Sequence, residues 1–445
     1  MTHAADQTTL ARRIGLFFLV VYGVGDIVGA GIYGTIGIAA GAMGNAVWLA
    51  FAASMVAAML TGLTYASISS RYPRAAGAAY VAQRAFRSPA VSYTIGLAVM
   101  ASGLTSIATA SNVFAANLSP LAGGLAPKAI VAAFLVTIAL VNLWGIRESM
   151  WANVACTAVE VGGLLLLVAV GARYWGTVDY LALPSAAGAA GEAEGLGFSL
   201  LLTGAVLTFY SFVGFEDMIN VSEEVKSPER TMPWGLVIAV GIATVIYIAV
   251  SVTAVSVVRP ESLADPSRGA PLVQIMGHAA PWLSPWVYRA ITLFAVANTA
   301  LINFIMATRL AYGMSRQGLL PRALGAVHRR RRTPHAAIAW LLAVALALGL
   351  TGTIPTLARA TSVLLLCVFF AMNAALLILQ RRPGEERGRF EVPPLVPLLG
   401  AAVCVLMIAH AKRAEVALSG ILILVILALY VVLRPKPAGA GSTTP

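Results

Sequence analysis

The sequence Gly29-Ala30-Gly31-Ile32-Tyr33 interrupts one hydrophobic stretch of this chain near its middle, and Tyr210-Ser211-Phe212-Val213-Gly214-Phe215-Glu216 interrupts another. A membrane span normally hides its backbone polar groups in an unbroken helix. Irregular backbone is tolerated at membrane depth only where protein buries it or water reaches it. Two interrupted spans at matching places in the two halves of a chain are typical of a transporter's binding site.

The composition places the chain in the membrane. Of its 445 residues, 59% are hydrophobic and 11% are charged, whereas soluble proteins have about 25% charged residues. A spanning helix needs roughly 20 apolar residues. The sequence therefore predicts an all-α integral membrane protein with 12 transmembrane helices. The candidate spans are 14–42, 45–70, 89–117, 128–145, 150–173, 196–222, 233–257, 284–314, 335–353, 357–380, 395–411 and 415–433.

The net charge of +12 at pH 7 is explained by topology rather than by nucleic-acid binding. With the N-terminus inside, most of the 30 Lys and Arg residues, including the run Arg329 to Arg332, fall in inner segments. This asymmetry follows the positive-inside rule and fits an even number of spans. We expect both termini in the cytoplasm and, because no organelle-targeting segment is recognised, a plasma membrane location. The alanine- and arginine-rich composition favours a bacterial source.

The two interruptions also predict the internal organisation. They lie in spans one and six, and each opens a block of five spans, so the blocks have opposite orientations, as inverted repeats require. We expect a five-plus-five inverted-repeat core with broken helices 1 and 6, its repeats at about 14–173 and 196–380, followed by two extra helices at about 395–433. Residues 1–434 then form a single transmembrane domain, and residues 435–445 read as a disordered cytoplasmic tail.

The broken helices predict complementary charges for a ligand. After the small residues of the first break, a half-helix presents free N–H groups and a positive dipole end, which suits a carboxylate. Carbonyl groups freed at the second break can accept from an ammonium group, so the pair fits an α-amino acid. The residues concerned are Gly29, Ala30, Gly31, Tyr210, Ser211 and Val213. An alternative for the first motif is close helix packing through Gly25-x-x-x-Gly29.

Aromatic and ionisable residues complete the candidate site. Tyr210 and Phe212 can cover a bound ligand as a gate, or they pack in the core or against lipid. Ionisable residues inside spans are costly and are functional candidates by default. Glu160 has no basic residue within four positions, and burial disfavours the charged form of a carboxyl group, so Glu160 can carry a proton. The alternative is a neutral, hydrogen-bonded structural group.

Three further ionisable residues lie within the spans. Asp26 borders the first break and could share a proton or a cation with Glu160, and Glu216 follows the second break and could titrate during opening. Arg309 lies near the cytoplasmic end of span eight, where we expect it to snorkel or to pair as a structural residue.

At these residues the chain resembles the amino acid–polyamine–organocation (APC) superfamily, and most of all its cationic amino acid transporter-like branch. The resemblance covers nearly the whole chain. It rests on four motifs in order, 25-GDIVGAGIY-33, 209-FYSFVGFE-216, 222-SEEVKSPER-230 and 309-RLAYGMSRQGLLP-321.

The resemblance implies a LeuT-like ten-helix inverted-repeat core with two extra helices. It implies a carboxylate held by backbone around Ile27, Gly29, Ala30 and Gly31. It also implies an ammonium group held by carbonyls around Tyr210, Ser211 and Val213, with Tyr210 as a gate. One position departs from the pattern, because some sodium-independent relatives place a lysine where this chain has Glu160. A carboxyl group cannot replace that cation, so it must bind one or be protonated.

The function expected from the sequence is secondary active transport of amino acids by alternating access, coupled to protons, with Na⁺ as the alternative ion. Amino acid or polyamine exchange, transport of inorganic ions and a non-transporting amino acid sensor of the same fold stay open. The chain has no Ser-Lys, paired-Asp or His-rich catalytic signature and no phosphate-binding G-x-x-x-x-G-K-[ST] loop. We therefore expect no enzyme, no cofactor and no bound metal.

Overall fold

The computed structural model of the protein describes residues 10–75, 77–119, 125–183, 197–268, 270–351, 355–385, 387–411, 413–433 and 435. Within these ranges the chain is helical and forms no strand beyond an isolated bridge between Ile14 and Val225. The α-helices are α1 (Leu16–Met43), α2 (Val47–Arg71), α3 (Gly77–Phe86), α4 (Pro89–Leu118), α5 (Pro127–Trp144), α6 (Ile146–Gly171), α7 (Phe198–Phe209), α8 (Pro228–Val257), α9 (Pro260–Ala264), α10 (Pro271–Ala279), α11 (Pro285–Arg316), α12 (His335–Thr351), α13 (Pro355–Arg381), α14 (Leu395–His410) and α15 (Arg413–Leu433). The 3₁₀ helices are η1 (Gly44–Ala46), η3 (Ala172–Tyr174), η5 (Tyr210–Phe212), η6 (Phe215–Glu224), η7 (Pro266–Arg268) and η8 (Arg322–Gly325).

Ten helical stretches of the described chain are long and apolar enough to cross a membrane. The predicted spans at 335–353 and 395–411 correspond to the shorter apolar helices α12 and α14, of 17 and 16 residues. The described residues therefore form an all-helical protein with ten candidate membrane spans, and the number twelve stays a prediction. The predicted tail at 435–445 lies outside the described residues apart from residue 435.

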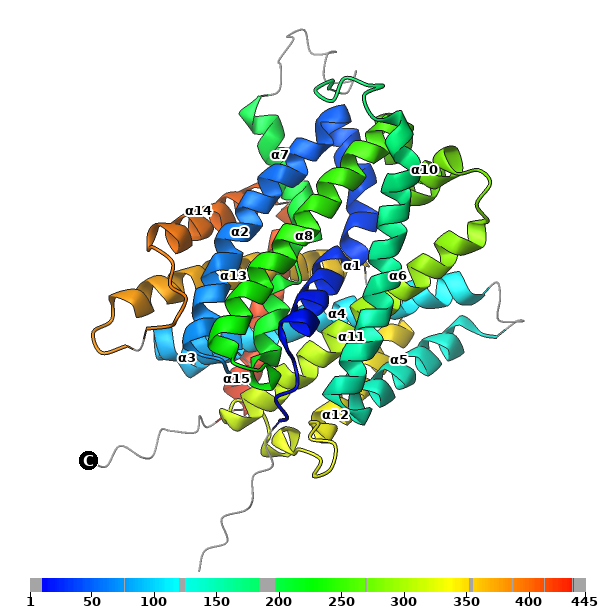
Figure 1. The fold of residues 1–445 in the computed structure, drawn as a ribbon. Helices are drawn as coiled ribbons and strands as arrows, with labels where there is room; N and C mark the ends of the chain where they lie inside the picture. The colour runs from blue at the N-terminus through cyan, green and yellow to red at the C-terminus, as the bar shows by residue number, and fades with distance from the viewer. Residues whose placement is uncertain are drawn as a thin grey trace, which may run out of the picture.

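Helix α1 runs through the middle of the molecule and packs against α6, α8 and α11 (Figure 1). Helix α2 packs along α8, and α4 packs along α11. The short helix α3, which was not among the predicted elements, connects α2 to α4. The start of α1 and the end of α15 lie at the same, lower end of the molecule (Figure 1).

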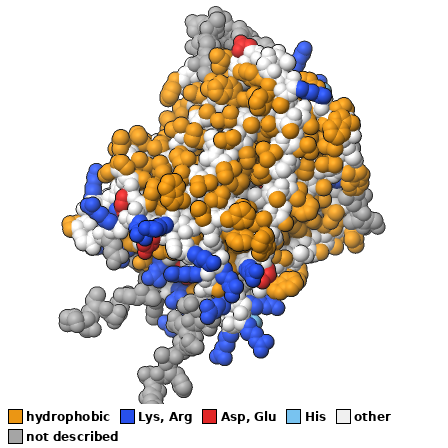
Figure 2. All heavy atoms as spheres, in the orientation of Figure 1, with side chains coloured by type: hydrophobic (Ala, Val, Ile, Leu, Met, Phe, Trp, Pro, Cys, Tyr) orange, Lys and Arg blue, Asp and Glu red, His pale blue; other side chains and the backbone are white. Residues whose placement is uncertain are grey.

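Charged side chains gather at that same end. Figure 2 shows hydrophobic side chains over the middle of the visible face and a concentration of Lys and Arg at its lower end. Because a bilayer requires an apolar belt, this distribution matches a protein that spans the membrane with its arginine-rich end on one side. We call this lower end, which carries Arg12, Arg74, Arg84 and Arg329–Arg332, the arginine-rich end.

A buried ion pair fixes the helices just inside the arginine-rich end. Arg309 of α11 is fully buried, and its Nε donates to Glu224 Oε2 of η6 at 2.9 Å. Its Nη1 donates to Asn142 Oδ1 of α5 at 2.7 Å. Arg309 therefore pairs rather than snorkels. The Glu224 carbonyl also accepts from the amides of Arg13 and Ile14 at 2.8 and 2.9 Å, so this glutamate holds the segment that leads into α1.

Replacing Arg309 by methionine leaves Glu224 as an uncompensated buried charge. Removing one partner of a buried pair costs about 3–5 kcal/mol, so we expect Arg309→Met to lower the thermal unfolding temperature of the detergent-solubilised protein strongly. The control is Arg268→Met, which removes a pair with Asp265 in which both side chains are exposed, so that solvent screening leaves it little effect on stability. Equally small shifts in the two variants would contradict this role of Arg309.

Candidate functional site at the two helix breaks

The first break lies where the sequence predicts it. Within α1 the backbone of Gly29 leaves helical geometry, with φ −21° and ψ −150°. Gly29 lies directly against α11, because a β-carbon there would be 2.8 Å from Thr299 Oγ1. A helical segment that starts after such a break has amide groups without partners in its first turn. The side chain of Ala30 lies outside the described side chains, although its backbone belongs to α1.

The second break separates α7 from η6. Helix α7 ends at Phe209, η5 follows, and Val213 is extended with ψ 135°. Gly214 then adopts φ +132°, a conformation that favours glycine. A β-carbon at Gly214 would lie 3.0 Å from the backbone carbon and oxygen of Asp26. The second break is therefore packed directly onto the first.

A tyrosine of α8 joins the two breaks. The hydroxyl group of Tyr247, which is fully buried, lies 2.5 Å from the Ile27 carbonyl oxygen and 2.6 Å from the Ser211 carbonyl oxygen. One hydroxyl, with a single proton to donate, therefore lies between one carbonyl from each interrupted helix. A second link is the 2.5 Å contact between the hydroxyl oxygens of Thr35 and Ser211. Tyr247 was not among the predicted site residues, because nothing in the sequence of α8 indicates a partner in α1 or η5.

A cavity of about 160 Å³ lies against both breaks. Its walls come from α1, η5, η6, α4, α11 and α13. Of the predicted site residues, the cavity is lined by Asp26, Ile27, Gly31, Tyr210, Val213 and Glu216. Its remaining polar lining comes from Ser102, Thr105, Ser106, Thr109, Asp217, Thr299, Asn303 and Thr361. The predicted residues therefore converge on one chamber, although Gly29, Ser211, Phe212 and Glu160 do not line it.

The two predicted gate residues have different surroundings. Tyr210 lines the cavity and is 47% exposed. Phe212 is fully buried, and its ring packs edge-on against Tyr247 with centroids 5.0 Å apart. The geometry favours a covering role for Tyr210 and core packing for Phe212.

Three buried carboxyl groups face the cavity. Asp26, Glu216 and Asp217 are at most 8% exposed. Glu216 Oε2 accepts from the Gly214 amide at 2.8 Å, and Asp26 Oδ2 has no hydrogen-bond partner among the described residues. The lining contains no Lys or Arg, so the cavity favours positive charge. Asp217 was not predicted, although the rule that singled out Glu216 applies equally to its neighbour.

Glu160 lies on α6, outside the cavity but linked to α1. Its Oε2 accepts from Asn298 Nδ2 of α11 at 3.1 Å, and its Oε1 has no partner among the described residues. Asn298 Nδ2 also lies 2.9 Å from Thr157 Oγ1 and 3.5 Å from the Gly25 carbonyl oxygen. Asn153 Nδ2 in turn donates to Asn298 Oδ1 at 2.8 Å. Glu160 thus belongs to a buried polar network that contacts the first half of α1.

The glycines of Gly25-x-x-x-Gly29 permit this approach. A side chain at Gly25 would overlap Thr157 Oγ1 and Asn298 Nδ2. The motif therefore allows close packing against α6 and α11, and its second glycine, Gly29, is the residue at which α1 breaks.

The conformation of Gly214 yields a direct prediction. Gly214→Ala places a methyl group against Asp26 and requires a backbone angle that costs an alanine about 1–3 kcal/mol. We expect a lower yield of monodisperse protein and a lower unfolding temperature. The control is Gly241→Ala on α8, where nothing lies within 4 Å of the new carbon and alanine favours the helix. A Gly214→Ala protein as stable as the Gly241→Ala protein would contradict the positive φ of Gly214 and its close packing on Asp26.

Comparison with known proteins identifies the family. Residues 14–433 match the amino acid permease family. The chain is 25% identical to the branched-chain amino acid permease BcaP of Bacillus subtilis over 432 residues, which cover 91% of this chain and 89% of that protein. It is 31% identical to an uncharacterised transporter of Mycobacterium tuberculosis over 427 residues, covering 96% and 92% of the two chains. It is 32% identical to the chloroplastic cationic amino acid transporter 9 of Arabidopsis thaliana over 345 residues, covering 72% and 58%.

The family and these relatives are transporters, not enzymes, which confirms that expectation. The four motifs that carried the resemblance lie within the matched range. This chain is a membrane protein of the amino acid permease family, within the amino acid–polyamine–organocation superfamily.

Proposed function

We propose that this protein is a secondary active transporter that moves amino acids across the plasma membrane by alternating access, coupled to protons. The observation that carries the proposal is the cavity between two broken helices, which are held together by Tyr247. Irregular backbone inside a membrane protein is stable only where such partners or a cavity satisfy it. Membership of the amino acid permease family supports an amino acid as cargo.

The architecture in this proposal is twelve spans built on a five-plus-five inverted repeat. In such a repeat, span n corresponds to span n + 5. The packing supports this, because α1 contacts α7, η5 and η6, α2 contacts α8, α4 contacts α11, and α5 contacts α12. These are the first four of the five corresponding pairs. Helices α14 and α15 then follow the repeat as the two extra spans.

The cargo in this proposal lies between the breaks. Its carboxylate accepts from backbone amides of the α1 break, around Ile27, Gly29, Ala30 and Gly31. Its ammonium group faces the second break, near the carbonyls of Tyr210 and Val213, with Tyr210 above it as a gate. The Ser211 carbonyl lies 2.6 Å from the Tyr247 hydroxyl, which fixes its position beside the break and leaves it a second lone pair for the ammonium group.

Proton coupling in this proposal runs through Glu160, with Asp26 and Glu216 as further carriers. Glu160 has one oxygen held by Asn298 and one oxygen without a described partner. The Asn298 side chain also reaches the Gly25 carbonyl, so a change in the charge of Glu160 acts on the half of α1 that must move. Na⁺ coupling is the alternative, and uptake under separate proton and Na⁺ gradients distinguishes the two ions.

The structure corresponds to an outward-facing state in this proposal. The cavity is lined by α4 residues from its middle toward the end farther from the arginine-rich end, Val99 to Val113, and by Thr361 and Leu365 in the farther half of α13. In this proposal the buried pair of Arg309 and Glu224 belongs to the closed, nearer side. On the positive-inside rule, we propose that the arginine-rich end and both termini lie in the cytoplasm. Relatives in Bacillus and Mycobacterium support a bacterial plasma membrane as the location.

The test is uptake of a panel of radiolabelled amino acids into liposomes that contain the purified protein. Uptake of one subset that is stimulated by a proton gradient supports a proton-coupled carrier. Stimulation by a Na⁺ gradient alone would identify Na⁺ as the coupling ion instead. Uptake that requires amino acid preloaded inside identifies an exchanger. Absence of uptake of every amino acid by folded protein overturns the proposal and leaves transport of polyamines or inorganic ions, or a sensor.

A second candidate cargo class is favoured by the three carboxyl groups of the cavity. A cavity lined by Asp26, Glu216 and Asp217 but by no basic residue suits a molecule with an extra positive charge, such as a polyamine. Putrescine and spermidine are therefore added to the panel, and uptake of these alone would select this candidate.

Glu160→Gln keeps the shape of the side chain but removes its ability to release and bind a proton. We expect this variant to bind cargo but to lose the stimulation of uptake by an inward proton gradient. The control is Glu148→Gln, which changes an exposed carboxyl group near the start of the same helix. Full gradient-stimulated uptake by Glu160→Gln would contradict coupling through Glu160.

A further inference from the structure

A second hollow, of about 950 Å³, opens at the arginine-rich end of the molecule. We call it the basic basin. Five regions of the chain form it. Three of them are the segment before α1, the end of α2 with α3, and the end of η6 with the start of α8. The other two are the end of α11 and the loop before α12. Its charged lining consists of Arg12, Arg71, Arg74, Arg84, Arg316, Arg332, Glu223 and Glu229.

Three of the six arginines already have partners. Arg71 donates to both carboxylate oxygens of Glu391, at 2.7 and 2.6 Å, and Arg84 pairs with Glu385. Arg316 donates to the Tyr312 hydroxyl at 2.8 Å. Burial raises the pKa of Glu385, but hydrogen bonds from Tyr72 and Arg84 outweigh it and hold that pKa below its usual value. Glu385 therefore stays ionised and satisfies Arg84.

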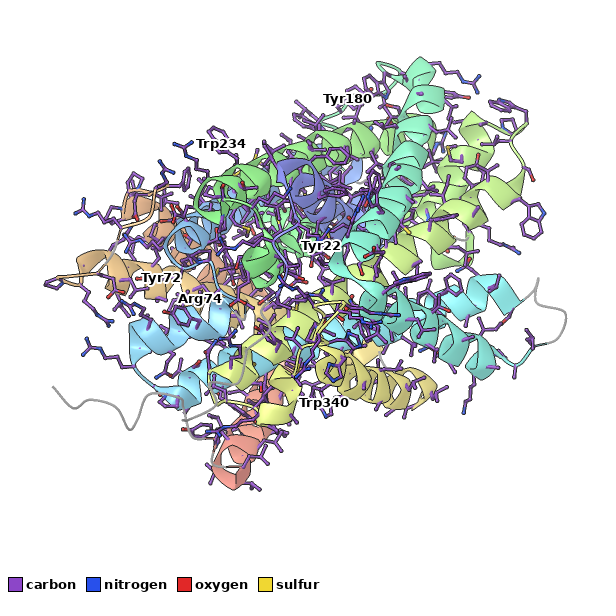
Figure 3. All side chains as sticks on the ribbon, turned by 60° about the horizontal axis from the view of Figure 1, so that its bottom comes forward. Tyr22, Tyr72, Arg74, Tyr180, Trp234 and Trp340 are labelled. Carbon is purple, nitrogen blue, oxygen red and sulfur yellow. The ribbon has the colours of Figure 1, made fainter. Side chains whose placement is uncertain are left out.

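The other three arginines have no such partner. The side chains of Arg12, Arg74 and Arg332 make neither an ion pair nor a hydrogen bond with any described residue, and all three are exposed. They come from three separate segments. Figure 3, which brings the arginine-rich end forward, shows Arg74 beside Tyr72 at the junction of α2 and α3.

The acidic residues of the basin do not neutralise it. Glu223 Oε1 accepts from the Ala75 amide at 3.1 Å. With Glu391 and Glu385 paired to Arg71 and Arg84, the lining residues Glu223 and Glu229 still leave an excess of two positive charges. Like charges held in one concave surface raise its potential and attract an anion.

We infer that the basic basin binds a phosphate-bearing anion, bridged by Arg12, Arg74 and Arg332. A guanidinium group is planar and donates pairs of parallel hydrogen bonds to phosphate oxygens. Several such groups from different segments suit an anion with more than one negative charge. The same chemistry occurs in the headgroup of an anionic phospholipid and in a soluble phosphate compound.

Anion binding here has a structural consequence for the closed end. Arg12 lies next to Arg13 and Ile14, whose backbone is hydrogen bonded to Glu224 and Lys226. Contact of one anion with both Arg12 and Arg74 cross-links this segment to the connection between α2 and α3. Because the anion binds the folded arrangement, it raises the stability of the protein.

The test uses the full-length protein in an uncharged detergent, with pyrophosphate as the soluble probe at constant ionic strength. Isothermal titration and thermal unfolding are measured for the wild type and for Arg12→Gln/Arg74→Gln. The control is Arg329→Gln/Arg330→Gln, which removes the same charge at the same end but from residues outside the basin lining. Native mass spectrometry with phosphatidylglycerol and phosphatidylcholine forms the lipid arm.

We expect saturable pyrophosphate binding that raises the unfolding temperature, weakened about tenfold or more in Arg12→Gln/Arg74→Gln and unchanged in the control. Retention of phosphatidylglycerol but not of pyrophosphate, with the same variant dependence, supports the site and identifies a lipid as its source. Absence of saturable binding of either probe overturns the inference. Equal weakening of anion binding in the two double variants overturns the inference as well, because binding would then depend only on the net positive charge of this end. The unliganded unfolding temperatures of the variants verify that they are folded.

Discussion

The hydroxyl group of Tyr247 is the contact on which the site depends. Two helices that lose their regular geometry inside a membrane expose carbonyl groups that lipid cannot satisfy. Tyr247 lies within hydrogen-bond distance of one such carbonyl from each break, at Ile27 and Ser211. Gly214 packs on Asp26 beside it. The breaks are therefore one unit built from α1, η5 and α8, and the cavity lies against that unit.

Helix η6 connects the cavity to the buried ion pair near the arginine-rich end. The short helix η6 carries Glu216 and Asp217 at the cavity and Glu224 at its other end. Glu224 binds Arg309 of α11 and the backbone of the segment that enters α1. A displacement of η6 must therefore act on the cavity lining and on the buried ion pair together. This is the connection that alternating access requires between a binding site and a gate.

Much of this arrangement could be predicted from the sequence. Glycines beside a charged residue inside an apolar span predicted both breaks, because glycine tolerates backbone conformations that other residues rarely adopt. Tyr247 and Asn298 could not be predicted. Each lies on a long apolar helix, and its role is set by the distant residue that packs against it, which local patterns do not encode. Arg309 was expected to snorkel or to pair, and the structure shows that it pairs; its partner Glu224 could not be named because it is remote in sequence.

Glu160 combines a feature that the sequence indicates with a contact that only the structure shows. The sequence singled out this carboxyl group because no basic residue lies near it along the chain. The structure adds Asn298, which holds one of its oxygens and also reaches α1. The interpretation as a hydrogen-bonded group and the interpretation as a proton carrier are therefore compatible, since an amide donor leaves the second oxygen available.

The central claim is that cargo binds between the two breaks. The most direct measurement is a cryo-electron microscopy structure of the protein with a transported amino acid. We expect density for the cargo in the cavity, with its carboxylate at the amides around Gly29 and its ammonium group near the carbonyls of Tyr210 and Val213. Cargo density elsewhere, with this cavity holding only water, would contradict the claim.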